Sequence, residues 1–398
     1  SVVIRHMPSK TPQFDRALKK YFSSLTLDAA GGQLRTCRFS GEKFYVRPED
    51  VSFYKNLGVP LPTLSPKERL RRKYAFSNHY NLFRSTSART QKSIVSMYPV
   101  DTPFSIYEHA LWFSDDWDPL SYAQDFDLVQ PFFPQFAKLH SAVPRPNLFT
   151  DPSNVNAEYT NTSVQLKDCY LVFDSVNAQE CSYSYTLVNC RNCVGSASVF
   201  DSENCYECIE ARKCYACFFC EYVTNCLESS FLYDCRNSTN CFMSSNLRNK
   251  QYYFYNKPLS KEEYFHRMKE VNLGSFQKLA GYLKDFSDLK QAAIYRAHHN
   301  TLSENVSGDL IANSKNVFDS LYILESQNIA YSMGFLGYKD TYDTVGGVGG
   351  ELCYELETVS TENNYRVLFS KFISRSHNIE YSDMCFDCAD CFGCVGLR

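Results

Sequence analysis

The residues best suited to chemistry in this 398-residue chain are its 18 cysteines. Many of them form C-x2-C pairs, a spacing that is compatible with zinc or iron–sulfur ligation by thiolates. The same thiols could form disulfides, or they could fill an interior as small, buried side chains. The pairs considered as metal ligands are Cys190, Cys193, Cys205, Cys208, Cys385, Cys388, Cys391 and Cys394.

The cysteines recur at a fixed twelve-residue step, which favours interior packing. Counting from Cys169 gives six cysteines and one serine, namely Cys169, Cys181, Cys193, Cys205, Cys217, Ser229 and Cys241. A second array places Val317, Ile329, Thr341, Cys353, Tyr365, Ile379 and Cys391 in the same slot, with a two-residue insertion after Tyr365. Because this slot accepts Val, Ile and Thr, we favour structural thiols with no cofactor. A zinc or iron–sulfur protein is the alternative.

The short period predicts a mainly β fold. Its β-branched, aromatic and Asn residues are typical of a β-solenoid, similar to a parallel β-helix, in which each coil stacks about 4.8 Å above the last. Such narrow coils hold only small side chains inside. The Asn or Asp residues that precede the inward slot, such as Asn192 and Asn204, indicate corners, where these residues tolerate a left-handed backbone.

The change of pattern along the chain predicts five segments. We expect an N-terminal extension with a short helix over 1–35 and an α+β domain over 36–150. The first solenoid array follows over 151–257, a helical insertion over 258–305, and the second array over 306–398. The insertion is indicated by a capping box at Ser260–Glu263 and by apolar residues at helical spacing after it.

Residues 67–92 are basic and interleaved with aromatic side chains, a combination that suits RNA or another phosphate-rich surface. The other interpretation is a solvated helix face that pairs with acidic segments, since the whole chain has a net charge of -3. The candidate contacts to RNA or to a partner are Arg69, Arg71, Arg72, Lys73, Arg84 and Arg89.

Other motifs do not assemble a catalytic site. No nucleophile, base and orienting group recur at a known spacing. The acidic residues between Asp115 and Asp127 are interpreted as solvated groups around packed tryptophans, and the glycines of 345–350 as a turn between coils. No run of about 18 apolar residues could span a membrane. We therefore expect no enzyme, no membrane partner and no small-molecule substrate.

Several motifs resemble an uncharacterised zinc-ribbon and Cys-repeat family that is abundant in candidate-phyla bacteria (Patescibacteria). They include Phe39–Glu42, Val143–Pro146, Tyr159–Asn161, Asn249–Tyr252 and the terminal Cys391–Arg398. The resemblance implies an N-terminal zinc ribbon. Here Cys37 stands at one ligand position, whereas Ser40, Ser65 and Glu68 occupy the other three. One thiolate cannot make a tetrahedral zinc site, so we expect a degenerate ribbon without zinc.

These patterns predict a noncatalytic subunit of a large assembly, in contact with other protein subunits. The first 24 residues carry Arg5, Lys10, Arg16, Lys19 and Lys20 against a single acid, which is typical of a chain trimmed after an import sequence. We therefore expect a reducing compartment inside the cell, with the mitochondrial matrix preferred over the cytoplasm. A mitochondrial ribonucleoprotein such as the mitoribosome is the expected home.

Overall fold

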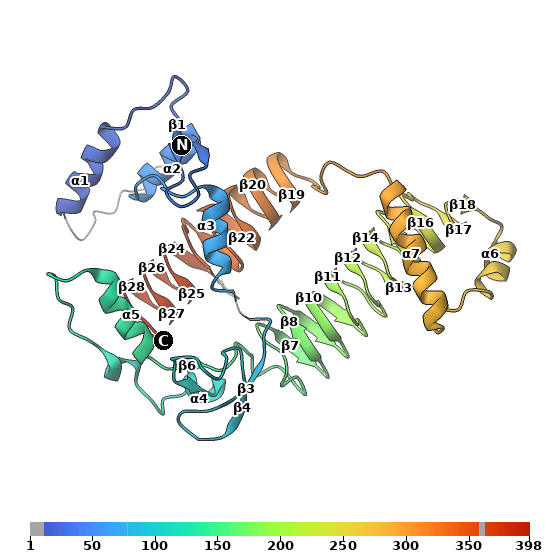
Figure 1. Cartoon of the computed structure of the whole chain (residues 1–398), viewed down its shortest axis with the longest axis horizontal. Helices are drawn as coiled ribbons and strands as arrows, with labels where there is room; N and C mark the ends of the chain where they lie inside the picture. The colour runs from blue at the N-terminus through green and yellow to red at the C-terminus, as the bar shows by residue number, and fades with distance from the viewer. Residues whose placement is uncertain (1–11, 78, 358–362) are drawn as a thin grey trace. The chain divides into compact units, whose positions relative to one another are not determined.

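The computed structural model describes residues 12–77, 79–357 and 363–398. The fold is mainly β, with long parallel sheets and few helices, which confirms the predicted class (Figure 1). The chain divides into two compact units. One comprises Ser1–Ser77 with His298–Arg398, and the other Asn78–Ala297, so the predicted segment 36–150 is divided after Ser77. Arg5 and Lys10 of the predicted import sequence lie outside the described residues.

The Asn78–Ala297 unit is built on a twelve-stranded sheet in which neighbouring strands are parallel, apart from the final β17–β18 pair. Its strands are β7 (Val164–Lys167), β8 (Tyr170–Phe173), β9 (Val176–Gln179), β10 (Ser182–Arg191), β11 (Ala197–Phe200), β12 (Ile209–Arg212), β13 (Tyr215–Phe218), β14 (Glu221–Thr224), β15 (Leu227–Tyr233), β16 (Thr239–Ser245), β17 (Gln251–Phe254) and β18 (Lys257–Pro258). Before the sheet come β3 (Phe83–Thr86), β4 (Ser93–Ser96), β5 (Ile106–Tyr107), α4 (His109–Trp112), η1 (Pro119–Tyr122), α5 (Phe132–Ala142) and β6 (Arg145–Pro146). After it come α6 (Lys261–Met268) and α7 (Phe276–Ala292).

The other unit joins an N-terminal segment to the second array. The segment holds α1 (Pro12–Ser23), β1 (Gln33–Thr36), β2 (Lys43–Val46), α2 (Pro48–Leu57) and α3 (Pro66–Tyr74). The array holds β19 (Glu304–Ala312), β20 (Lys315–Leu324), β21 (Gln327–Ala330), β22 (Met333–Tyr342), β23 (Val348–Glu351), β24 (Asn364–Leu368), β25 (Lys371–Ser374), β26 (His377–Glu380), β27 (Asp383–Phe386) and β28 (Ala389–Phe392). Aromatic residues of α2 pack on this array, where the rings of Phe53 and Tyr342 stack at 3.8 Å.

Parallel pairing in the first array joins residues twelve positions apart, as in Ser184↔Val172 and Val199↔Ala211. Every third residue is buried, and the residue before it usually has a left-handed backbone, with φ of 54° at Asp168 and 52° at Asn192. Left-handed φ is costly for most side chains and is tolerated best by Asn and Asp. The asparagines of the repeat therefore occupy positions at which the backbone is left-handed.

Buried hydroxyl and thiol groups continue the pairing inside the array. The Ser184 hydroxyl donates to the carbonyl of Ser182 at 2.8 Å and accepts the amide of Ser196 at 3.0 Å. In the same way, the amide of Cys193 donates to the sulfur of Cys181 at 3.4 Å. A buried amide without an acceptor costs about 1–3 kcal/mol. Ser and Cys therefore suit the interior positions, because they are small and because their side chains accept hydrogen bonds from the amides twelve residues later.

Two details that the sequence predicted for the second array are wrong. Tyr365 is exposed, whereas Asn364 is buried and donates from its side chain to the carbonyl of Ile373 at 2.8 Å. Pairing across this region joins residues fourteen apart, as in Tyr354↔Leu368, so the two-residue insertion precedes Asn364 instead of following Tyr365. The physical reason is hydrogen bonding, because the Asn364 side-chain oxygen accepts the amide of Ser376 at 3.2 Å, as the interior serine hydroxyls do at other positions of the repeat.

The expectation of small interior side chains and a glycine turn is also corrected. Tyr338 is buried inside the second array, and its strand partner is Gly350 of β23. A Cβ atom at Gly350 would lie 2.4 Å from the Tyr338 ring. The glycine run is thus partly a strand, and Gly350 provides the space in which one large ring fits.

Replacing Cys193 tests whether the interior needs a thiol or only a small side chain. Cys193 is fully buried. We expect Cys193→Phe to lower the free energy of unfolding by about 1–3 kcal/mol because the ring overfills the interior. Cys193→Val should be nearly neutral, since Val317 and Ile329 are buried at the equivalent slot of the second array. Guanidinium denaturation checks both variants, and a Val variant as unstable as the Phe variant would mean that the thiol itself is required.

Candidate partner-binding surface

Most of the cysteines lie in the interior, and their thiols form no disulfide within the described residues. Fifteen of the 18 are buried, and Cys388, Cys391 and Cys394 are half-buried. The thiol of Cys190 donates to the carbonyl of Val199 at 3.2 Å, and Cys208 makes the equivalent contact with Cys217 at 3.3 Å. Among the residues that the structure describes, no three His, Cys, Asp or Glu side chains are arranged around one metal position. The thiols act here as hydrogen-bond donors to the backbone of neighbouring strands.

Two of the six basic residues predicted to contact RNA are buried, which corrects that prediction. Arg69 is 2% exposed and Lys73 is 4% exposed. Both lie on the face of α3 that meets Asp343, at distances of 2.9 Å from the Arg69 Nη1 atom and 3.7 Å from the Lys73 Nζ atom. A surface ligand does not reach these groups. Their charge instead attaches α3 to the second array.

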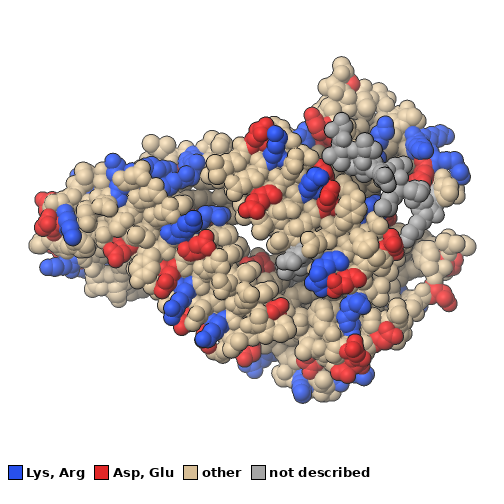
Figure 2. Space-filling model, turned by 180° about the vertical axis from the view of Figure 1, so that it is seen from behind, with Lys and Arg blue, Asp and Glu red and all other residues tan. Residues whose placement is uncertain are grey.

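The other four basic residues are exposed and divided between the two units. Arg71 pairs with Glu68 of its own helix at 2.7 Å, and Arg72 pairs with Glu355. In the other unit, Arg84 lies on β3 and is exposed, as is Arg89. Arg71 and Arg72 are thus the exposed members of the set in one unit, and Arg84 and Arg89 are the exposed members in the other. On the face drawn in Figure 2, Lys and Arg side chains are interspersed with Asp and Glu.

A buried polar network surrounds Asp343. Arg69 Nη1 donates to the Tyr54 hydroxyl at 2.9 Å, and this hydroxyl lies 3.4 Å from Asp343 Oδ2. Burial lowers the pKa of Lys73 from 10.5 to about 8, although the Asp343 carboxylate favours the charged form. When Lys73 is protonated, two cations face one carboxylate in the interior. This network is a structural element with a pH dependence, and it joins α3 to the second array.

The expected degenerate ribbon region has a counterpart that sequence reasoning missed. In the β1–β2 hairpin, Cys37 N donates to Glu42 O at 2.8 Å, and in the β3–β4 hairpin, Ser87 N donates to Lys92 O at 2.9 Å. Each hairpin also donates one amide to a segment that leads into a helix, α3 in the first case and α4 in the second. Arg38 N contacts Thr63 O, and Ala88 N contacts Ile106 O. The two hairpins therefore share one backbone pattern, although their sequences differ.

Polar groups hold each hairpin to the N-cap residue of a helix, which is Ser65 for α3 and Glu108 for α4. Burial opposes ionisation of Cys37, but hydrogen bonds from Ser40 and from backbone amides lower its pKa to about 6. In the second hairpin, the hydroxyls of Ser87 and Thr90 both donate to the Glu108 carboxylate. These bonds outweigh the effect of burial and hold the pKa of Glu108 below its ordinary value. Each hairpin region therefore has one acidic group, the Cys37 thiol or the Glu108 carboxyl, that accepts several hydrogen bonds.

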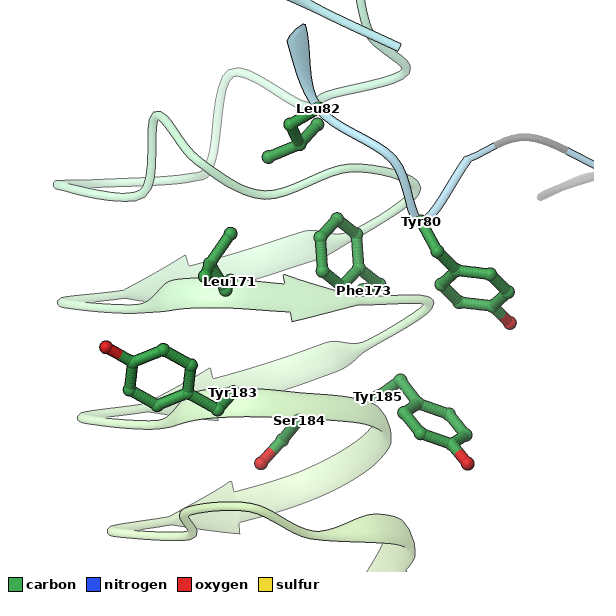
Figure 3. A pocket seen from close by; sticks show the side chains of 7 residues that line it. All are labelled: Tyr80, Leu82, Leu171, Phe173, Tyr183, Ser184 and Tyr185. Carbon is green, nitrogen blue, oxygen red and sulfur yellow. The ribbon is translucent and has the colours of Figure 1, made fainter.

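A concave surface of the first array is an aromatic groove. It has a volume of about 650 Å³, and its lining residues are Tyr80, Leu82, Leu171, Phe173, Tyr183, Ser184 and Tyr185. Strands β8 and β10 supply most of them, and the segment after His79 supplies Tyr80 and Leu82. Figure 3 shows Tyr80 and Tyr185 at one end, and Leu171 and Tyr183 at the other. Tyr183 is 62% exposed and Tyr185 is 49% exposed.

The strand geometry explains why these side chains are outside. Leu171 and Tyr183 stand twelve residues apart and both have left-handed φ of 52°, just before the buried positions Val172 and Ser184. Phe173 pairs with Tyr185 in the register between β8 and β10. The paired strands β8 and β10 thus place their apolar side chains side by side, and large exposed apolar surfaces commonly mark interaction sites.

Asp174 fixes the segment that forms the other wall of the groove. Its Oδ2 atom lies 3.0 Å from His79 Nε2 and accepts a hydrogen bond from the Tyr80 hydroxyl at 2.6 Å. The Thr162 hydroxyl donates to the other carboxylate oxygen. Burial opposes ionisation, but these bonds outweigh it and hold the pKa of Asp174 below its ordinary value. The groove is therefore a defined surface that is formed before any ligand binds.

Sequence reasoning placed the partner contact elsewhere and missed this groove. Tyr183 and Tyr185 alternate with Ser182 and Ser184, and only the twelve-residue register reveals that they face Leu171 and Phe173. The signal available in the sequence was the concentration of Tyr and Phe at outward slots around 170–185.

Comparisons with known proteins leave the family open. No protein-family model matches the chain, and no curated protein matches it. Within the described residues, no helix is both long enough and apolar enough to cross a membrane.

Proposed function

We propose that this protein is a noncatalytic interaction subunit of a large assembly and that its two arrays are β-solenoids with twelve-residue coils. The observation that carries the proposal is the aromatic groove of about 650 Å³, which half-exposed tyrosines line on the first array. Aromatic side chains of this kind supply much of the binding energy at protein interfaces. The proposed occupant is a segment of another protein subunit.

The repeat architecture supports a scaffold role. Each strand pairs with the segment twelve residues away, so the array offers a long surface with regularly spaced side chains. Solenoid proteins use such surfaces to bind extended partners. The basic N-terminal sequence supports a mitochondrial ribonucleoprotein as the assembly, and Arg71, Arg72, Arg84 and Arg89 are the exposed residues left from the predicted RNA contact.

Native sedimentation of the full chain from its own cells tests the proposal. We expect the tagged protein to sediment with particles far larger than its own 45.8 kDa. The double variant Tyr183→Ser and Tyr185→Ser should shift most of it to the monomer fraction, because it removes the aromatic walls of the groove.

The matched control changes exposed apolar residues outside the groove. Tyr215 and Leu227 are 45% and 41% exposed, and they pair between β13 and β15. Tyr215→Ser with Leu227→Ser should leave the protein in the large particles. Sedimentation of the parent as a free monomer, or equal loss in both double variants, would contradict the proposal.

A further inference from the structure

A column of arginines runs along one side of the first array. Arg212 pairs with Thr224 between β12 and β14, and isolated parallel bridges continue the column from Thr224 to Arg236 and from Arg236 to Arg248. Neighbouring strands lie about 4.8 Å apart. Arg236 and Arg248 are therefore direct neighbours, and Arg212 lies two steps away.

The charges of this column are incompletely neutralised. Asp234 receives a hydrogen bond from Arg248 at 2.7 Å and lies 4.0 Å from Arg296. In the part of the chain that the structure describes, Arg236 makes no ion pair, and Arg212 contacts the ring of Phe200 at 4.0 Å. Like charges on adjacent strands destabilise a sheet unless another group compensates them. Arg236, Arg248 and Arg296 therefore share one carboxylate, that of Asp234.

Arg296 is brought to this cluster by a separate segment of the same unit. The Asn246 side chain donates to Ile294 O at 2.9 Å and accepts the amide of Ile294 at 2.9 Å. The Tyr295 ring packs on Tyr233 with centroids 5.5 Å apart. The Arg296 Nη1 atom is buried without a hydrogen-bond partner among the described residues. The Asp234 carboxylate, 4.0 Å away, faces this donor without forming a hydrogen bond, so the Arg296 guanidinium can still donate to another acceptor.

The structure assigns this face a ligand, and we propose that it is the phosphodiester backbone of single-stranded RNA. Guanidinium groups bind phosphate oxygens through paired donors. A single small anion reaches only Arg236, Arg248 and Arg296, whereas Arg212, two strand steps away, requires an extended polyanion. Tyr295 is 61% exposed beside Arg296 and offers a ring on which a base stacks. This site lies outside the aromatic groove and goes beyond the proposed function.

Fluorescence anisotropy with the full chain and a labelled oligouridine of about 16 nucleotides tests the site. We expect the parent to bind with an affinity that falls as salt rises from about 50 to about 200 mM. The double variant Arg212→Gln and Arg236→Gln should bind about tenfold more weakly or worse. It should also reduce the slope of log K against log salt by about 1.4, which corresponds to two lost phosphate contacts.

The variant and its control separate binding from folding. Neither Arg212 nor Arg236 has an ion pair to lose within the described chain, so the thermal midpoint of the double variant should not fall. Lys278→Gln with Lys284→Gln removes the same charge from exposed positions of α7 and should leave binding unchanged. An unchanged salt slope in the arginine variant, absence of oligouridine binding by the parent, or displacement of the oligonucleotide by inorganic phosphate at constant ionic strength would overturn the proposal. Because the groove variants leave the arginines intact, failure of one proposal is distinguishable from failure of the other.

Discussion

Replacing Asp343 with Asn is expected to lower the free energy of unfolding of the N-terminal and second-array unit by about 3–5 kcal/mol. Asp343 is fully buried, and Arg69 and Lys73 both lie within 4.0 Å of it. The substitution leaves two cations in the interior without a counter-charge, and removing one partner of a buried ion pair has a cost of this size. Asn has nearly the same shape as Asp, so the loss of stability would arise mainly from the missing charge.

Two optical signals locate this effect within the chain. Both tryptophans, Trp112 and Trp117, belong to the Asn78–Ala297 unit. In guanidinium denaturation, we expect the circular dichroism transition to move to lower denaturant while the tryptophan fluorescence transition stays in place. Asp387→Asn is the control, because its ion pair with Arg375 is more than half exposed and contributes little. Equal effects of the two substitutions would show that the Asp343 network does not stabilise the fold.

Replacing Lys73 with Met is expected to stabilise the same unit at neutral pH, by up to about 3 kcal/mol. Burial lowers the pKa of Lys73 from 10.5 to about 8, and each unit of pKa corresponds to about 1.4 kcal/mol. Below pH 8 the lysine is charged in the folded and unfolded states, so the parent bears the full cost of a buried cation. Met removes this cation and leaves Arg69 balanced by Asp343.

The advantage of Lys73→Met should decrease as the pH rises from 8 toward 10.5. In this range the unfolded parent still binds a proton at Lys73 and the folded parent does not, so the stability of the parent rises with pH. Buried tyrosines such as Tyr331 have raised pKa values, but they affect parent and variant alike and cancel in the difference. Denaturation at several pH values measures this difference. Lys67→Met, at an exposed position of α3, should show no such trend, and a pH-independent gain at Lys73 would refute the explanation.

Local patterns predicted several elements correctly. The Ser260 side chain accepts the Glu263 amide at 3.2 Å, which confirms the capping box at the start of α6. Asn192 donates from its side chain to Asn204 at 3.1 Å, which links two asparagines twelve residues apart. Both features depend on residue types at fixed short spacing, so they can be recognised in the sequence.

The predicted site failed where distant segments meet. On sequence alone, Arg69 and Lys73 look like members of an exposed basic helix, because Asp343 lies in the second array, far along the chain. The groove was missed for the same reason, since His79 and Tyr80 meet Asp174 only after the chain has folded. No local pattern encodes these contacts.

The sequence by itself determined the mainly β class and the small, buried character of slots such as Cys193, because the twelve-residue period repeats one residue type through many turns. Only the tertiary structure decided where a residue could depart from this pattern of small interior side chains and Asn at left-handed positions. Tyr338 is accommodated because Gly350 is its strand partner, and Tyr183 and Phe231 adopt left-handed backbone although neither is Asn or Gly. Hydrogen bonds between neighbouring strands and the packing of buried residues outweigh the local preference of a single residue, and these forces act only between segments that folding brings together.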